Sequence, residues 1–271
     1  MAPKYPFTPE ILDALPEELA ELFRALELTL LTEICTRLKL ANDLNEVTLD
    51  MIRALRSHGI SLKEIEKAIS DTSGVGFDKL QALMDGVVAR NQAYYTAMID
   101  FARVTEPQVL VNQQDVEAIR RQTIDEYTNI TGSMGFQVKK GGQTVLIPPG
   151  KAYQWALDKA AIQIQSGAIS YEQAITTAVK ELADSGLRIV TWESGHVDQV
   201  DVAVRRAVLT GINQVNQKYR EQSMEYLQTD LVEVTAHSGA RDVDGPNGWE
   251  NHKKWQGRVY RWSRKAVTPI L

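Results

Sequence analysis

The sequence predicts a mainly α protein, in which a helical bundle is followed by a small α+β C-terminal region. Three observations lead to this prediction. Apolar residues recur every three or four positions over most of the chain before residue 230, and capping residues and glycines bracket several of these stretches. Alternation with a period of two is confined to short pieces near residues 132–150, 188–192 and 231–236.

The N-terminal helical region, residues 1–131, is expected to contain helices at 16–41, 48–57, 61–69, 77–104 and 112–130. Thr48 caps the second helix and Gly59 follows its end. Ser61 and Glu64 form a capping box for the third. The inner positions of the first helix are Leu19, Leu22, Phe23, Leu26, Leu30, Ile34 and Leu38, and those of the fourth are Leu80, Leu83, Val87, Tyr94, Met98 and Phe101.

Residues 132–150 are expected to form a hairpin or an ordered loop at the pair Gly141 and Gly142, and to mark a domain boundary. A second helical region, 151–229, follows, with helices at 151–165 and 198–227. Between them, Ser170 and Gln173 form a capping box for a helix that ends near Gly186, and a strand follows at 188–192. Residues 230–271 form the small C-terminal region, which begins with a strand at 231–236.

Composition excludes several classes of protein. A net charge of −5 argues against a protein that coats nucleic acid over its whole surface, so any such contact must be local. The single cysteine, Cys35, rules out a disulfide framework and is expected to be a small buried hydrophobe. The absence of a long apolar run and of a signal-peptide pattern predicts a protein made in the cytoplasm, without a membrane partner.

The C-terminal region concentrates cations and aromatic rings. Between Lys253 and Lys265 there are six basic residues and no acidic one. The candidates for binding nucleic acid or a partner protein are Lys253, Lys254, Trp255, Arg258, Arg261 and Trp262, with Arg264 and Tyr260 in the same run. Cations can hold phosphates while aromatic rings stack on bases. The alternative is a solvated cationic edge whose aromatic side chains pack inward.

His237 and His252 are weak candidates for a metal site, since imidazole is a common zinc ligand. Asp242, Asp244 and Glu250 are the nearby carboxylates that can complete such a site. The alternative is that the histidines bond to backbone groups and that the tryptophans form a small core. The chain contains no GxxxxGK[ST], HExxH, CxxC or GxSxG motif. We therefore expect no enzyme, no catalytic residue and no cofactor.

Several short pieces of the sequence, taken together, resemble the type-2 family of phage minor capsid proteins. The pieces are NITG (129–132), YQWALDKA (153–160), SG (166–167), Tyr171 with QAI (173–175), SG (194–195), VRRAV (204–208) with Thr210, Gly211 and Gln214, DLVEV (230–234), AHSGAR (236–241) and WQGRVY (255–260). The C-terminal region is also similar to the head-morphogenesis domain of the F-type minor head proteins of Mu-like phages. The motif residues there are His237, Gly239, Arg241, Trp255 and Gly257.

The resemblance implies a virion protein that works beside the portal and major capsid proteins in head assembly, with a role in DNA packaging or retention as a further expectation. Members of the family continue past the Trp-Gln-Gly motif into a glycine-rich stretch with a Cys-Arg-His type ending. This chain reads RWSRKAVTPIL there, so we expect a different or shortened tail.

Two other interpretations stay open at this point. One is a metal-dependent hydrolase or toxin-like enzyme built on His237, Arg241, His252 and a carboxylate such as Asp242. The other is a scaffolding or regulatory protein that leaves before the head matures. The first requires bound metal, and the second requires absence from the finished particle.

Overall fold

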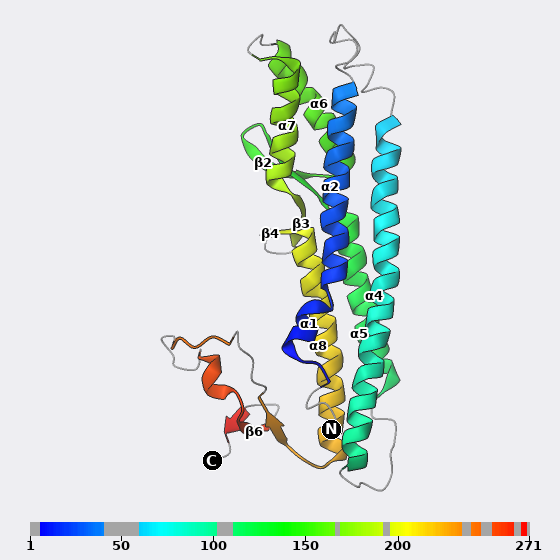
Figure 1. Cartoon of the computed structure of the whole chain (residues 1–271), viewed down its shortest axis with the longest axis vertical. Coiled ribbons are helices and arrows are strands. Elements are labelled where there is room, and N and C mark those ends of the chain that lie inside the picture. Colours follow the sequence, from blue (N-terminus) through cyan, green and yellow to red (C-terminus); the bar gives the residue numbers. More distant parts are fainter. Residues whose placement is uncertain are drawn as a thin grey trace. The chain divides into compact units, whose positions relative to one another are not determined.

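The structure is a computed structural model, and it is mainly helical with two small antiparallel sheets among the residues that it describes (Figure 1). Those residues are 6–40, 60–101, 111–165, 169–191, 196–234, 240–244, 251–262 and 267–269. The predicted fold class is confirmed. Within this part of the chain, no helix has both the length and the apolar character that a bilayer crossing requires.

The helices are α1 Pro9–Ala14, α2 Glu17–Leu40, α4 Ile60–Phe101, α5 Gln113–Ser133, α6 Pro149–Gln165, α7 Tyr171–Ser185, α8 Val200–Tyr226 and the short 3-10 helix η1 His252–Trp255. The strands are β1 Gly135–Lys140, β2 Gln143–Ile147, β3 Leu187–Thr191, β4 His196–Gln199, β5 Leu231–Glu233, β6 Val259–Trp262 and β7 Val267–Pro269. The helix expected at 48–57, with Thr48 and Gly59, lies outside the described residues.

The chain divides into two compact units. Unit 1 consists of Met1–Asp13, Asp85–Ile119 and Ile212–Leu271, and unit 2 of Ala14–Met84 and Arg120–Gly211. Each unit contains its own buried apolar side chains. The boundaries expected at residues 131, 150 and 229 stay a prediction.

Helix α2 supplies a large part of the core of unit 2, as its apolar spacing predicts. Five of its expected inner positions are at most 2% exposed, and these are Leu19, Phe23, Leu26, Leu30 and Ile34. The helix packs against α7 and α6 (Figure 1). Leu22 and Cys35 are half-buried on the same helix, so Cys35 is less enclosed than a core residue.

Residues 132–150 contain a β-hairpin, which is one of the two forms expected. Strand β1 pairs antiparallel with β2, with Lys140 opposite Gln143 at the turn. The turn residues Gly141 and Gly142 have φ values of 59° and 81°. Glycine takes these left-handed conformations without steric cost, so the turn depends on the Gly-Gly pair.

The hairpin belongs to a four-stranded antiparallel sheet in the order β2-β1-β3-β4. Strand β3 confirms the one expected near 188–192. Strand β4 was not predicted, because its four residues lie beside a helix start and acquire strand structure by pairing with β3. Helices α6 and α7 pack against β1, and Phe136, Val138 and Leu187 of the sheet are at most 1% exposed.

Helix α7 begins and ends where the sequence predicts. The Ser170 hydroxyl oxygen accepts a hydrogen bond from the Gln173 N–H at 3.3 Å, and the Gln173 side-chain oxygen accepts one from the Ser170 N–H at 3.1 Å. Gly186, with a φ of 68°, donates its N–H to the Leu182 carbonyl at 3.1 Å. The predicted capping box and the predicted helix end at Gly186 are both confirmed. Each depends on only a few neighbouring residues, so the local sequence is enough to predict it.

Helix α4 is a single helix, so the prediction of separate helices at 61–69 and 77–104 is wrong. The stretch DTSGVG at 71–76 suggests a break, but it is helical throughout. Tyr127 of α5 donates a hydrogen bond from its hydroxyl to the Ser73 carbonyl at 3.0 Å. A Cβ atom on Gly76 would overlap that hydroxyl. Gly76 therefore permits a close contact between helices instead of ending one.

A second glycine, on α8, makes room for another side chain of α5. Gly211 of α8 is buried, and a Cβ atom there would overlap the side chain of Thr123. Thr123 and Tyr127 are four residues apart and therefore lie on one face of α5. Both are at most 4% exposed. Helix α5 thus depends on glycines of two neighbouring helices for its place in unit 2.

Arg24 of α2 joins the first turns of two helices in unit 2. Its guanidinium lies 2.8 Å from a carboxylate oxygen of Glu17 and 2.9 Å from one of Asp201 in α8. The other Glu17 oxygen lies 3.0 Å from Arg205. The hydrogen bond from Arg24 lowers the pKa of Glu17 below its ordinary value of 4.5. Both acids lie in helix first turns, where the helix dipole also favours negative charge.

In unit 1, α4 and α8 meet through a buried polar pair and a stacked aromatic pair. Asn91 is fully buried, and its amide donates to the Asn216 side-chain oxygen at 2.7 Å and to the Val87 carbonyl at 2.9 Å. The rings of Tyr95 and Tyr219 stack with centroids 6.0 Å apart. The bond to Asn216 favours one alignment of the two helices, because a slip would break this hydrogen bond of the fully buried Asn91 amide N–H.

The predicted inner face of α4 is correct at some positions, and at others the buried residue is the one that follows the predicted residue. Leu80 and Val87 are buried, whereas Leu83, Tyr94 and Met98 are half-buried. The neighbours Met84, Tyr95 and Ile99 take the buried positions instead. The side chain of Phe101 lies outside the described part. Sequence spacing alone does not separate adjacent apolar residues in such a helix.

We predict that Gly76→Ala destabilises the protein by roughly 1 to 3 kcal/mol, because the added methyl group displaces the buried Tyr127 hydroxyl. Gly74→Ala is the matched control, since a Cβ atom there meets no atom within 4 Å. It should stabilise the helix by about 0.5 to 1 kcal/mol. Urea unfolding of both variants and of Gly76→Ala with Tyr127→Phe measures the effects. Equal destabilisation by the two alanines would contradict the packing account.

We predict that Glu17→Gln lowers stability at neutral pH and that this loss shrinks in acid. The folded pKa of Glu17 is depressed, so its contribution is present above about pH 4.5 and disappears as the pH falls through the folded pKa. The carboxylate is solvent-accessible, so added salt should reduce the difference. Thermal unfolding between pH 7 and pH 3 tests this, with Glu21→Gln on the same helix as control. A difference that grows in acid would refute the assignment.

Candidate partner-binding surface

The C-terminal region contains a three-stranded antiparallel sheet in the order β5-β6-β7. Strand β5 confirms the start of the strand expected at 231–236, and residues 235–239 lie outside the described part. Strands β6 and β7 were not predicted. Strand β6 falls in the cationic run, where charged residues conceal the alternating pattern, and β7 has only three residues. Both become strands through pairing with each other.

Alternation along β6 separates an inner face from an outer one. Tyr260 is 2% exposed, and its ring packs against Trp255 of η1 with centroids 5.4 Å apart and a tilt of 33°. Leu231, Val259 and Arg261 are exposed on the opposite face. Two aromatic residues of the run therefore form a small core, and the outer face presents a cation between apolar side chains.

Gly257 has a clear structural reason to be a glycine. Its φ is 67°, and its N–H donates to the Val234 carbonyl at 2.8 Å. This bond ties the turn after η1 to the end of β5. A residue with a side chain would be strained in this conformation.

The two lysines of η1 are paired with acidic residues. Lys253 lies 2.7 Å from the Asp242 carboxylate, and Lys254 lies 2.5 Å from that of Asp244. The hydrogen bonds from these lysines lower the pKa of both aspartates. Asn251, which is 8% exposed, donates to the Asp242 carbonyl at 2.8 Å. Asp242 and Asp244, considered above as metal ligands, thus bind ammonium groups here.

The remaining cations of the run differ in their surroundings. Arg261 lies 3.4 Å from the Asp230 carboxylate. Arg258 is exposed, and among the described residues it has no acidic partner. Arg264 and Lys265 lie outside the described residues. Three of the four described cations of the run therefore have a carboxylate nearby, and Arg258 is the described one most available to a partner.

Trp262 lies beneath a cation that sequence inspection did not connect with it. The guanidinium of Arg220, on α8, sits 5.5 Å from the centre of the Trp262 ring. No local pattern joins these residues, which belong to a helix and to a strand 42 positions later. The stack links the C-terminal sheet to α8 within unit 1.

The histidine hypothesis finds no support among the described residues. His252 is the exposed first residue of η1, and His237 and Gly239 lie outside the described part. No three His, Cys, Asp or Glu side chains gather there into a group that could hold a metal. Arg241, the remaining family-motif residue, has an exposed side chain, and its carbonyl accepts the Lys253 N–H at 3.1 Å. A metal site that includes His237 stays a prediction.

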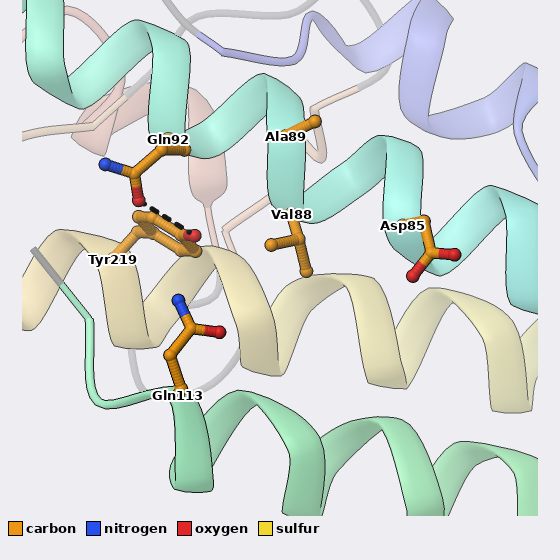
Figure 2. Close-up of a pocket in the computed structure, with 6 residues that line it drawn as sticks. All are labelled: Asp85, Val88, Ala89, Gln92, Gln113 and Tyr219. Carbon is orange, nitrogen blue, oxygen red and sulfur yellow. Dashed lines mark hydrogen bonds between the residues drawn. The ribbon is translucent and has the colours of Figure 1, made fainter. Parts of the chain in front are cut away.

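A hollow of about 370 Å³ lies elsewhere in unit 1, between residues of α4, α5 and α8. Figure 2 shows Gln92 beside Tyr219, whose hydroxyl donates to the Gln92 side-chain oxygen at 3.3 Å. Gln113 extends toward the same ring from the start of α5 (Figure 2). Asp85 is the charged member of its lining. These groups resemble no arrangement for catalysis, and an anion would not be favoured there.

Comparison with protein families assigns the chain to the structural proteins of the phage head. The match is to the family described as phage minor capsid protein 2 over residues 7–269, and the chain belongs to this family. No curated protein and no solved structure matches it. The chain is therefore a capsid protein and part of a multi-subunit virion. The similarity to the Mu-like domain stays a prediction.

We predict that Tyr260→Ala opens the C-terminal sheet locally and lowers its stability by about 3 kcal/mol, because a buried aromatic ring is removed. Val259→Ala, at an exposed neighbouring position, is the control and should have little effect. Hydrogen exchange of the β6 amides reports the opening. Unchanged protection in Tyr260→Ala would show that this ring does not hold the sheet together.

Proposed function

We propose that this chain acts beside the portal during head assembly and that its C-terminal region contacts a neighbouring head protein. The observation that carries the proposal is the outer face of the cationic run, where Arg258 and Arg261 lie exposed beside Val259. Exposed arginines next to apolar side chains are typical of protein interfaces. The family assignment supports a role in the head, and the portal and the major capsid protein are the proposed partners.

A protein partner is favoured over packaged DNA by the local charge balance. Lys253, Lys254 and Arg261 each have a carboxylate within 3.4 Å. A surface that binds the DNA backbone gains affinity from cations that neutralise phosphates and release counterions. Cations already paired with carboxylates contribute less to such binding. A role in DNA packaging or retention remains a second prediction, with Arg258 as its strongest candidate.

We predict that changing Lys253, Lys254, Arg258 and Arg261 to Glu lowers incorporation of the chain into heads by about tenfold. Reversing the charge of the proposed contact surface would remove its electrostatic complementarity to the partner. The assay is complementation of a phage that lacks this protein, followed by quantification of the chain in purified heads and of infectious yield. A charge-matched control changes the exposed lysines Lys67, Lys140, Lys151 and Lys180 to Glu.

Glutamate at 253 and 254 faces Asp242 and Asp244, so the fourfold variant can disturb the C-terminal region itself. Arg258→Glu alone avoids this, because among the described residues Arg258 has no acidic partner. A reduced incorporation of Arg258→Glu supports a contact surface. Normal incorporation and normal yield for both variants would rule the surface out. Loss of DNA from normally assembled heads would favour the DNA role.

A further inference from the structure

A groove of about 650 Å³ lies in unit 1 and reaches the C-terminal sheet at strand β5. Four segments line it: the start of the described chain, the end of α4, the end of α8 and strand β5. The lining residues that matter most here are Tyr94, Met98, Arg220, Met224, Leu227 and Glu233. Its size is within the usual range for binding pockets.

The groove has walls that are held in place before anything binds. On one side, the Arg90 guanidinium donates to the Pro6 carbonyl at 2.6 Å and lies 5.2 Å from the centre of the Phe7 ring. On the other, Gln228 lies in the turn after α8 with a φ of 51°, and the Thr229 N–H donates to the Met224 carbonyl at 2.9 Å. Binding to a preformed groove requires little ordering of the protein.

The lining is suited to apolar side chains of a peptide. Tyr94, Met98, Met224 and Leu227 are half-buried, so each presents part of its surface to the groove. Methionine side chains adapt to differently shaped partners, and tyrosine rings give large rigid contacts. Amides of Asn213 and Gln217 add hydrogen-bonding groups.

Of the described residues that line the groove, Arg220 is the one cation. Its guanidinium carbon lies 5.5 Å from the centre of the Trp262 ring, a cation-π contact that favours this position of the group. Among the described residues, no carboxylate lies within ion-pair distance of it. An exposed guanidinium of this kind can bind a carboxylate through two hydrogen bonds.

We infer that the groove binds an apolar peptide segment of a neighbouring head protein, and that a carboxylate on this segment pairs with Arg220. The inference rests on the proposed function and names the chemistry of the partner. DNA is the weaker occupant, since a polyanion needs several cations and this lining contains Arg220 together with the acidic Glu233.

The test uses the purified full-length chain and overlapping peptides that tile the portal and major capsid proteins of the same phage. Each peptide is printed once as it stands and once with Asn and Gln in place of Asp and Glu. Peptides that combine apolar residues with an acid should bind, and their amide versions should not. In solution, Arg220→Gln should weaken the best peptide by about tenfold or more, since a charge-assisted hydrogen bond is lost. The affinity of Arg220→Lys for this peptide should lie between that of the unaltered chain and that of Arg220→Gln.

Two further variants keep the result interpretable. Lys151→Gln removes an exposed cation of unit 2 and should leave peptide binding unchanged. Met98→Gln alters the groove without changing Arg220 or Trp262 and should also weaken binding. A folding defect in Arg220→Gln cannot explain the loss of binding by the amide peptides, because that loss is measured on the unaltered chain.

The inference would be overturned if neither Arg220→Gln nor Met98→Gln weakened peptide binding. It would also be overturned if no peptide bound to the unaltered chain. Binding of a DNA duplex that depends on Arg220, without peptide binding, would also overturn it. If the chain is found in heads and no peptide binds, the groove assignment alone fails. Absence of the chain from heads would remove the proposed function and this inference together.

Discussion

The close contact of α5 with its neighbours in unit 2 depends on two glycines. Tyr127 presses against Gly76 of α4, and Thr123 presses against Gly211 of α8. Both α5 side chains are almost completely buried, and each occupies the space that a side chain at the facing glycine would need. The ring of Phe23 then meets that of Tyr127 at 5.9 Å, which brings α2 into the same packing. A methyl group at either glycine would therefore disturb contacts among several helices.

Charge acts locally in this protein. In unit 2, Arg24 binds two carboxylates in helix first turns, and in the C-terminal region Lys253 and Lys254 each bind an aspartate. A count of basic residues suggests a polyanion-binding strip, but most of the described cations there already have a partner. The cations that remain, Arg258 and Arg220, are single and lie beside apolar groups. This arrangement favours contact with protein.

Features that depend on a few neighbouring residues could be predicted from the sequence. The capping box at Ser170 and the Gly141 hairpin are examples, as is the buried face of α2. Features that depend on distant residues could not. Gly76 looks like a helix break until Tyr127 is known to lie against it, and the Arg220–Trp262 stack has no local signature. The candidate cations were found from the sequence, whereas their aspartate partners and the groove required the structure.

The chain belongs to the phage minor capsid protein 2 family, so it should be found in the phage head. The most direct test is quantitative mass spectrometry of gradient-purified phage heads, with the chain measured relative to the coat and portal proteins. Our account predicts that the chain is present in mature heads at far fewer copies than the coat protein. Its absence from both mature particles and empty proheads would contradict the account.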